Sequence, residues 1–288
     1  MLPVVMTIAG SDNSAGAGAQ ADLKTMSALG VYGVTAITCV VAEVPGKVSA
    51  IQPVEPRIVA EQIRLLFEAF PIAAVKTGML YSREIIATVC DTLEECFARG
   101  GPRPFLVVDP VMVATSGEPL LRDDAVALYR ERLFPLAGII TPNLDEVRSL
   151  LGRSVTSVDE MASAGRELVR TFKTAVLVKG GHLREAAAVD LLFEKRKMHE
   201  FRARRVPGVS THGTGCSYSA AIAANVGKGL PLVAAVSDAK RFVTAAIAHF
   251  LRWQVGGRTT DALHHFDPRA VGAGGPRIFP GDPPVKEV

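Results

Sequence analysis

The segment of this chain that most clearly points to a chemical function runs from Ser210 to Cys216 and reads STHGTGC. Two glycines, Gly213 and Gly215, flank Thr214 just before an alanine-rich run that predicts a helix. Such a loop leaves backbone N–H groups without intrahelical partners, next to the positive end of a helix dipole. These groups bind anions, most usefully a phosphate or the developing charge of a phosphoryl group. Because Cys216 stands where an acid or thiol would face a substrate, the segment predicts phosphoryl transfer.

Two charged residues stand at the ends of apolar runs that predict strands. Asp109 ends the run LVVD, and Pro110 stops the strand there. A carboxylate at the carboxyl end of a parallel strand is well placed to hold Mg²⁺, although an Asp before a Pro also starts ordinary turns. Lys179 ends the run VLVK before two glycines. A lysine beside flexible backbone suits a phosphate contact, and a β-turn is the alternative interpretation.

The run ITPNLDEV places Asn143 and Glu146 just past another predicted strand. Asn143 followed by Glu146 three residues later is typical of a capping box at the start of a helix. The same Glu146, if it lies near Asp109, completes a pair of carboxylates that organises a metal ion. Both interpretations remain open from the sequence.

The glycine-rich stretch after the first predicted strand admits a competing function. Counted from Gly16, it satisfies the pattern G-x-G-x-x-A of dinucleotide-binding proteins, and Glu43 could serve as the ribose-binding acid. This predicts an NAD(P)-dependent oxidoreductase, but the glycines come several residues after the strand instead of in its first turn. Asp12 and Asp22 of the same stretch are functional candidates that could equally cap a helix or face solvent.

Apolar, β-branched runs alternate with helical patterns along most of the chain. The predicted strands are 3–9, 34–42, 73–76, 105–109, 137–140, 174–179 and 188–193. The predicted helices are 17–29, 56–69, 82–98, 122–132, 143–151, 158–172, 214–227 and 231–252. This alternation predicts an α/β fold with a parallel sheet and helices on both faces. Ligands of such sheets bind at the carboxyl ends of the strands, where the motifs above fall.

We expect one domain over residues 1–254 and a loosely ordered C-terminal tail over 255–288, because glycine and proline dominate the tail. Residues 43–52 interrupt the alternation and form either a short β-flap over the site or a plain surface connection. No internal repeat is visible.

Composition excludes several classes of protein. The 288 residues carry a net charge of +3, which is too balanced to indicate nucleic acid or an anionic membrane as partner. No run reaches the roughly 18 apolar residues of a membrane span. The four cysteines show no metal-binding spacing and suit a reducing compartment. We therefore expect a cytoplasmic protein.

Taken together, the motifs resemble those of a known family. The chain resembles the ribokinase-like vitamin kinases, and most closely the hydroxymethylpyrimidine/phosphomethylpyrimidine kinases of thiamine biosynthesis. The resemblance covers about residues 4 to 253, and residues 263–266 (LHHF) add a further short similarity. It rests on the motifs TIAGSDNSAGAGAQADLKTMSALG, VKTGML, VVDPVMVATSG, ITPNLDE, VKGGH and THGTGC. It implies a three-layer ribokinase-like fold with a mostly parallel sheet and a small β-flap, assembled as a homodimer. It also implies that ATP and Mg²⁺ are used to phosphorylate a hydroxymethylpyrimidine and its monophosphate. A pyridoxine/pyridoxal kinase of the same superfamily is the alternative, and the oxidoreductase is a remote one.

The resemblance also implies roles for individual residues. The expected substrate contacts are Gly10, Asp22, Glu43 and Met79. The expected ATP contacts are Asn143, Lys179, Thr211 and Lys240, with Lys240 near the adenine. Asp109 and Glu146 would organise Mg²⁺, and Gly213, Thr214, Gly215 and Cys216 would form the anion hole.

We make a further hypothesis for two of these residues, Cys216 and Glu43. At the N-terminus of a helix, Cys216 has a setting that favours the thiolate, and it would accept the hydroxyl proton in the first phosphorylation. Glu43 stands where the pyrimidine kinases usually have a glutamine. An ionised glutamate accepts hydrogen bonds but cannot donate one, so Glu43 would bind the pyrimidine well only if one of the two partners were protonated.

Overall fold

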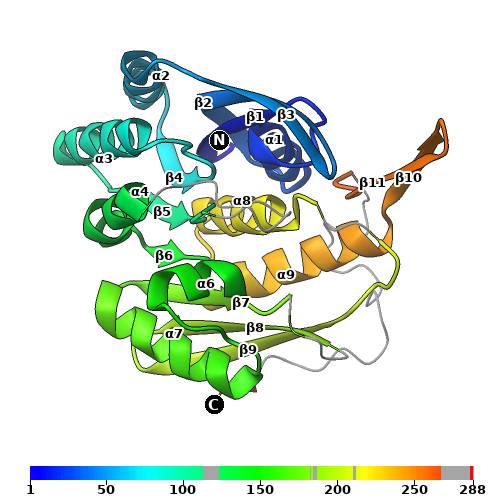
Figure 1. Ribbon diagram of the computed structural model, residues 1–288. Coiled ribbons are helices and arrows are strands. Elements are labelled where there is room, and N and C mark those ends of the chain that lie inside the picture. Colours follow the sequence, from blue (N-terminus) through cyan, green and yellow to red (C-terminus); the bar gives the residue numbers. More distant parts are fainter. Residues whose placement is uncertain (113–122, 182, 184–186, 210–211, 267–285, 288) are drawn as a thin grey trace.

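Short runs rich in valine, isoleucine and alanine form the middle of one large sheet. The computed structural model describes residues 1–112, 123–181, 183, 187–209, 212–266 and 286–287. In this part of the chain the sheet has the strand order β12-β9-β8-β7-β6-β5-β4-β1-β2-β3 (Figure 1). Its strands are β1 (Val4–Asp12), β2 (Tyr32–Val44), β3 (Lys47–Pro53), β4 (Ile72–Thr77), β5 (Phe105–Val108), β6 (Ile139–Ile140), β7 (Ala175–Lys179), β8 (Ala187–Glu194), β9 (Lys197–Arg204) and β12 (Lys286–Glu287).

The central strands, from β2 through β1, β4, β5 and β6 to β7, pair in parallel. At one edge β3 pairs antiparallel to β2, and at the other β8, β9 and β12 add antiparallel strands. The hairpin β2–β3 accounts for the expected β-flap. Because the central strands run the same way, their carboxyl ends meet along one edge, which is where the motif residues lie.

Helices cover both faces of the sheet (Figure 1). They are α1 (Gly18–Ala28), α2 (Pro56–Ala69), α3 (Arg83–Ala98), α4 (Asp123–Leu128), α5 (Phe134–Leu136), α6 (Leu144–Leu151), α7 (Val158–Phe172), α8 (Thr214–Gly227) and α9 (Leu232–Ala248). Alternate residues of each strand face opposite layers, as the two-residue period of a strand requires. On β1, for example, Met6 and Ile8 belong to a core cluster with residues of α2, α3, α4, α6 and α7, whereas Val5 belongs to a second cluster with residues of α1, α8 and α9. The mixed α/β fold with a mostly parallel sheet is therefore confirmed.

All of the expected strands and helices are present, with differences at the ends of two helices. The helix expected over 122–132 is α4 followed by a π-helical turn, Tyr129–Leu133. The helix expected to reach residue 252 ends at Ala248, because residues 251–255 are paired in a hairpin instead.

The expected domain boundary at residue 254 falls inside this hairpin. The hairpin consists of β10 (Leu251–Val255) and β11 (Arg258–Ala262) and projects from the rest of the domain (Figure 1). After it, Leu263 and His265 are buried against the domain. The expectation of a loose tail from residue 255 is therefore wrong as far as residue 266, and residues 267–285 and 288 lie outside the described part. None of the helices in the described ranges is long and apolar enough to cross a bilayer.

Candidate active site

An ion pair lies at the carboxyl ends of β5 and β7. Lys179 Nζ lies 2.8 Å from Asp109 Oδ1, and the Thr141 hydroxyl donates to the same oxygen at 3.1 Å. Burial opposes ionisation of Asp109, but the positive charges of Lys179 and Lys76 outweigh it and lower the pKa of the carboxyl. Asp109 is therefore a carboxylate. Both residues lie at strand ends as we expected, but we did not predict their ion pair.

The anion-binding loop lies directly against this pair. Ser219 on α8 donates to the second carboxylate oxygen of Asp109 at 3.1 Å. A Cβ atom added to Gly215 would lie 3.4 Å from Lys179 Nζ and 3.8 Å from Asp109 Oδ2. Because glycine has no Cβ, the loop backbone can approach both charges closely. Ser219 was not predicted, since its contact with Asp109 depends on how α8 packs against β5.

Glu146 confirms the capping-box interpretation, and it also interacts electrostatically with Asp109. It forms a capping box with Asn143 at the start of α6: the Asn143 N–H donates to Glu146 Oε2 at 2.7 Å, and the Glu146 N–H donates to Asn143 Oδ1 at 2.9 Å. Burial raises the pKa of Glu146 to about 8; the charge of Lys179 lowers it and that of Asp109 raises it. Glu146 therefore interacts electrostatically with the ion pair and can change its protonation state near neutral pH.

The start of α8 has the features of an anion site. Gly213 is its N-cap, with φ +79°, and as a glycine it has no side chain with which to cap the helix. A Cβ atom at Gly213 would lie 1.7 Å from the Gly16 carbonyl oxygen, so only glycine fits here. The Thr214 hydroxyl is buried and has no hydrogen-bond partner in the described part of the chain. An unsatisfied buried hydroxyl beside uncapped N–H groups fits a ligand oxygen.

Cys216 differs from our expectation of a thiolate. Burial raises the pKa of its thiol to about 11; Lys76 lowers it, Asp22 and Asp109 raise it, and the Gly18 N–H lowers it. Desolvation thus outweighs the helix N-terminus, and the thiol is protonated in the free protein. The prediction of a thiolate-favouring setting was wrong for this state.

Two of the expected substrate residues, Gly10 and Met79, lie together. The Gly10 N–H donates to the Met79 carbonyl at 3.1 Å, and Thr38 donates to the same oxygen at 2.7 Å. A Cβ atom at Gly10 would lie 2.8 Å from Cys39 Sγ and 3.7 Å from Met79 Sδ. Gly10, Thr38, Cys39 and Met79 therefore lie together near the end of β1.

Glu43 lies near the end of β2, close to a second charged group. Its backbone N–H donates to Asn13 Oδ1 at 2.6 Å. Burial and the charge of Asp12 raise the pKa of Glu43, and His212 acts in the opposite direction. Asp12 is no solvent-exposed residue: its carboxylate accepts from the N–H groups of Ser14 and Ala17 at 2.7 and 2.8 Å.

Asp22 does not lie where a ligand can reach it. It is completely buried, with Oδ2 2.7 Å from Lys76 Nζ and 2.6 Å from the Thr7 hydroxyl. The expectation of direct substrate contact through Asp22 is therefore corrected: Asp22 holds Lys76 beneath the site. Lys76 was missed, although a lysine inside the apolar run AAVKTGML was a visible signal.

Of the other two residues expected to contact ATP, Lys240 and Thr211, the structure describes Lys240. Lys240 on α9 is bound by Asp190 at 2.6 Å, and the other oxygen of Asp190 accepts from the Gly180 N–H at 3.0 Å. Lys240 is thus connected to the residue after Lys179 but does not lie in the ion pair. Thr211 lies outside the described residues.

Metal binding at this site would depend on the nucleotide. Among the described residues, no three His, Cys, Asp or Glu side chains converge on one point. Mg²⁺ is commonly held by one or two carboxylates together with substrate phosphates, so Asp109 and Glu146 are a sufficient protein contribution.

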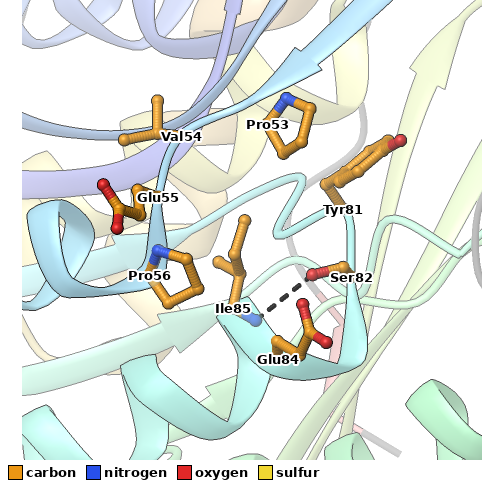
Figure 2. A pocket seen from close by; sticks show the side chains of 8 residues that line it. All are labelled: Pro53, Val54, Glu55, Pro56, Tyr81, Ser82, Glu84 and Ile85. Carbon is orange, nitrogen blue, oxygen red and sulfur yellow. Dashed lines mark hydrogen bonds between the residues drawn. The ribbon is translucent and has the colours of Figure 1, made fainter.

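A surface pocket elsewhere in the molecule is not part of this site (Figure 2). Its lining residues are Pro53, Val54, Glu55, Pro56, Tyr81, Ser82, Glu84 and Ile85. It lies between the β3–α2 connection and the start of α3, where Ser82 caps the helix by accepting from the Ile85 N–H at 3.3 Å. None of the expected site residues lines it.

Comparison with known proteins agrees with this geometry. The model of the phosphomethylpyrimidine kinase family matches residues 12–261. A hydroxymethylpyrimidine/phosphomethylpyrimidine kinase from Rhizobium meliloti is 47% identical over 92% of this chain and 98% of its own length. The crystal structure of phosphomethylpyrimidine kinase from Clostridium difficile is 39% identical, with a TM-score of 0.74 over 85% of this chain and 99% of that one.

A second group of structural relatives consists of pyridoxal kinases. The Staphylococcus aureus pyridoxal kinase in complex with AMP-PCP and pyridoxal is 30% identical, with a TM-score of 0.82 over all of both chains. The backbone is thus shared between the two groups, whereas sequence identity favours the pyrimidine kinases. The oxidoreductase alternative is wrong, because the matching family and the relatives named above are phosphotransferases. The chain belongs to the phosphomethylpyrimidine kinase family of ribokinase-like phosphotransferases.

Proposed function

We propose that this chain transfers the γ-phosphoryl group of ATP to 4-amino-5-hydroxymethyl-2-methylpyrimidine and then phosphorylates the monophosphate to the diphosphate, in thiamine biosynthesis. The observation that carries the proposal is the approach of the Gly213–Cys216 loop to the Asp109–Lys179 pair, with Gly215 between them. Phosphoryl transfer requires an anion site and a cation around one point, and the approach of the loop to the ion pair supports such an arrangement.

Lys179 and the loop would stabilise the transferring group. The Lys179 ammonium remains charged, because Asp109 and Glu146 outweigh burial and raise its pKa. A fixed cation and N–H dipoles in a site that excludes water stabilise developing charge without reorganisation. Asn143 would contribute through its position at the start of α6, beside Lys179.

Asp109 and Glu146 would hold Mg²⁺ together with the ATP phosphates. When bound, the ion neutralises phosphate charge and orients the phosphates. Loss of a proton from Glu146, whose pKa lies at about 8, supplies the second negative charge for this role.

Cys216 would accept the proton of the substrate hydroxyl in the first phosphorylation. Lys76 and Lys179 are the cations whose charge interacts with the thiol and would stabilise a thiolate. In the second phosphorylation the attacking group is a phosphate, which is already anionic and needs little base. The substrate would be positioned against Gly10 and Met79, with Glu43 facing the pyrimidine ring.

We also propose that the protein forms a homodimer and acts in the cytoplasm. The β2–β3 hairpin exposes Val40, Val44 and Val48, and exposed apolar side chains support burial against a second copy. No nucleic acid or membrane partner is proposed.

The test is ATP consumption in the presence of Mg²⁺ with hydroxymethylpyrimidine, its monophosphate and pyridoxal side by side. Turnover of both pyrimidines with poor turnover of pyridoxal supports the proposal. Preference for pyridoxal would mean that Glu43 has redirected the pocket, and the phosphotransferase assignment would stand while the substrate changed. Chelation of Mg²⁺ by EDTA is expected to abolish turnover, and retained activity would contradict the metal role.

A further inference from the structure

The segment after the β10–β11 hairpin reaches back to the start of α8. His265 Nε2 lies 2.8 Å from the hydroxyl oxygen of Ser217, the residue after Cys216. Ser217 is completely buried, and His265 is only 2% exposed. The bond therefore joins the first turn of the anion-binding helix to a residue beyond position 261, where the match to the family model ends.

His265 is itself held in place by α9. The backbone N–H of His264 donates to the Ala246 carbonyl at 3.0 Å, near the end of that helix. The ring of Phe242 lies 6.5 Å from the His265 ring, and Leu263 is buried next to them. Because α9 fixes the segment, the imidazole is a rigid support and does not simply follow Ser217.

The imidazole is neutral over the range in which a kinase works. Burial lowers the pKa of His265 to about 4, and the charges of Lys24 on α1 and of His264 act in the same direction. A neutral ring nitrogen and a hydroxyl form an ordinary hydrogen bond, and between two buried groups such a bond is costly to break. The contact thus has a fixed strength near neutral pH.

A second support of α8 comes from the other end of the chain. Gly213 lies against the Gly16 carbonyl, with room for no side chain. The N-cap residue of α8 is a glycine and offers no capping side chain, so contacts with other parts of the chain contribute to fixing its first turn. The loop after β1 and the segment around His265 are therefore two separate parts of the chain that determine where α8 begins.

We propose that His265 is a positioning residue for phosphoryl transfer. Through Ser217 it fixes the first turn of α8, so that the backbone N–H groups of Thr214 to Cys216 and the Cys216 thiol are aimed at the transferring group. Catalysis by positioning is sensitive to small displacements, and a misplacement of about 1 Å costs on the order of a hundredfold in rate. The inference rests on the proposed phosphotransferase function and adds a residue to it that does not touch the substrate.

The test removes the bond from each side in the full-length enzyme. His265→Phe keeps a ring but cannot bond to Ser217, and it is expected to lower kcat about ten- to a hundredfold with KM for both substrates within about twofold. His265→Gln, whose amide can restore the bond, is expected to lose less. Ser217→Ala is expected to match His265→Phe, and the double variant to lose no more than either single one, because both remove the same interaction.

His199→Phe is the matched control. His199 on β9 is 3% exposed, similar to His265, but lies far from α8 in the sheet. Its replacement is expected to leave kcat unchanged whatever it does to Tm. Folded His265→Phe with kcat within about twofold of the native enzyme would overturn the proposal, as would losses that multiply in the double variant.

A substrate-free readout separates this proposal from the function on which it rests. The rate at which iodoacetamide alkylates Cys216 is expected to change several-fold in His265→Phe and Ser217→Ala, and to stay unchanged in His199→Phe. An unchanged rate in all variants would overturn the positioning role. Absence of pyrimidine turnover by the native enzyme would count against the proposed function and leave this readout valid.

Discussion

Asp22 and Lys76 form an ion pair at 2.7 Å in which both side chains are completely buried. The two residues come from α1 and β4 and lie 54 positions apart in the sequence. The charge of Lys76 acts on Asp109 and on Cys216, so the pair lies beneath both halves of the proposed active site. An added Cβ atom at Gly78 would lie 2.7 Å from Lys76 Nζ, which shows how closely the lysine head is packed.

Removal of one member of this pair is expected to destabilise the protein strongly. Asp22→Asn and Lys76→Met each leave a charge buried without its partner, which costs about 3–5 kcal/mol. The double variant Asp22→Leu/Lys76→Met leaves no charge and is expected to recover a large part of that loss. The free energy of unfolding in urea measures all three.

The exposed pair of Asp238 and Arg241 on α9 is the control for this series, with side chains 38% and 64% exposed. Asp238→Asn is expected to change stability by about 1 kcal/mol or less, because solvent screens exposed pairs. Equal costs for Asp22→Asn and Asp238→Asn would contradict the account of the buried pair.

The expected strands and helices were predictable because their signal is local. Apolar runs such as VVMTIAG and LVVD mark strands that are buried on both faces, and these became β1 and β5. The strand β9 was missed because its sequence KMHEFRAR is mostly polar, so no apolar run marks it, although it forms a tight hairpin with β8. The hairpin β10–β11 was missed although Leu251, Trp253 and Val255 alternate with polar residues, because the helix expected to reach residue 252 and the tail expected from 255 divided this segment.

The active site was predictable in its strand-end residues and not in its supports. Asp109 and Lys179 each follow an apolar run, so their meeting at one sheet edge follows from parallel topology. Ser219 and His265 act through contacts between distant segments, which no local pattern encodes, whereas Lys76 could have been noticed as a lysine inside an apolar run. The thiol pKa of Cys216 was expected in the wrong direction because the helix N-terminus was visible in the sequence and the burial was not.

Gly213→Ala is expected to damage catalysis more than folding. The added Cβ atom would lie 1.7 Å from the Gly16 carbonyl oxygen, so α8 or the loop after β1 must move. Backbone strain at φ +79° adds about 1–2 kcal/mol. We expect kcat to fall on the order of a hundredfold, measured by ATP consumption under saturating substrates.

Gly152→Ala separates the clash from the strain. Gly152 has φ +71° but has open space around the position of its Cβ atom. Like Gly213→Ala, the Gly152→Ala variant should lose the part of Tm that backbone strain costs. Its kcat should remain that of the native enzyme. Comparable losses of kcat in both variants would show that the contact with Gly16 is unimportant.

The raised pKa of Cys216 predicts slow alkylation near neutral pH. A thiol with a pKa of about 11 instead of 9.0 has about a hundredfold less thiolate at pH 8. The rate with iodoacetamide, followed by mass spectrometry of the Cys216 peptide, should therefore rise through pH 9 without levelling off. Cys39, Cys90 and Cys96 are buried and serve as internal references that should remain unmodified in the folded protein. A plateau below pH 9 would contradict the burial argument.

The proposed role of Cys216 as proton acceptor predicts different losses in the two phosphorylations. Cys216→Ser is expected to lower kcat for the hydroxymethyl substrate by about 10²–10⁴-fold, the usual contribution of a positioned base. For the monophosphate the loss should be much smaller, because the attacking phosphate oxygen is already anionic. The two activities are measured separately with purified substrates. Equal losses would remove Cys216 from the proton-transfer step and leave it a structural part of the loop.

Glu43→Gln is expected to change how substrate binding depends on pH. Burial and the charge of Asp12 raise the pKa of Glu43, so its neutral form persists to a higher pH than that of an exposed glutamate. Either a neutral Glu43 or a protonated ring nitrogen is needed to complete the hydrogen bond, so the native complex requires one bound proton. As pH rises, loss of this proton should increase KM for the pyrimidine. The increase should be about tenfold per pH unit above the pKa of Glu43 or of the ring nitrogen, whichever is higher. A glutamine can donate and accept without this proton, so KM of the variant should be nearly independent of pH between 6 and 9.

Glu61→Gln, on the exposed surface of α2, is the control and should keep the native pH profile. Parallel profiles for all three proteins would show that Glu43 does not contact the ring.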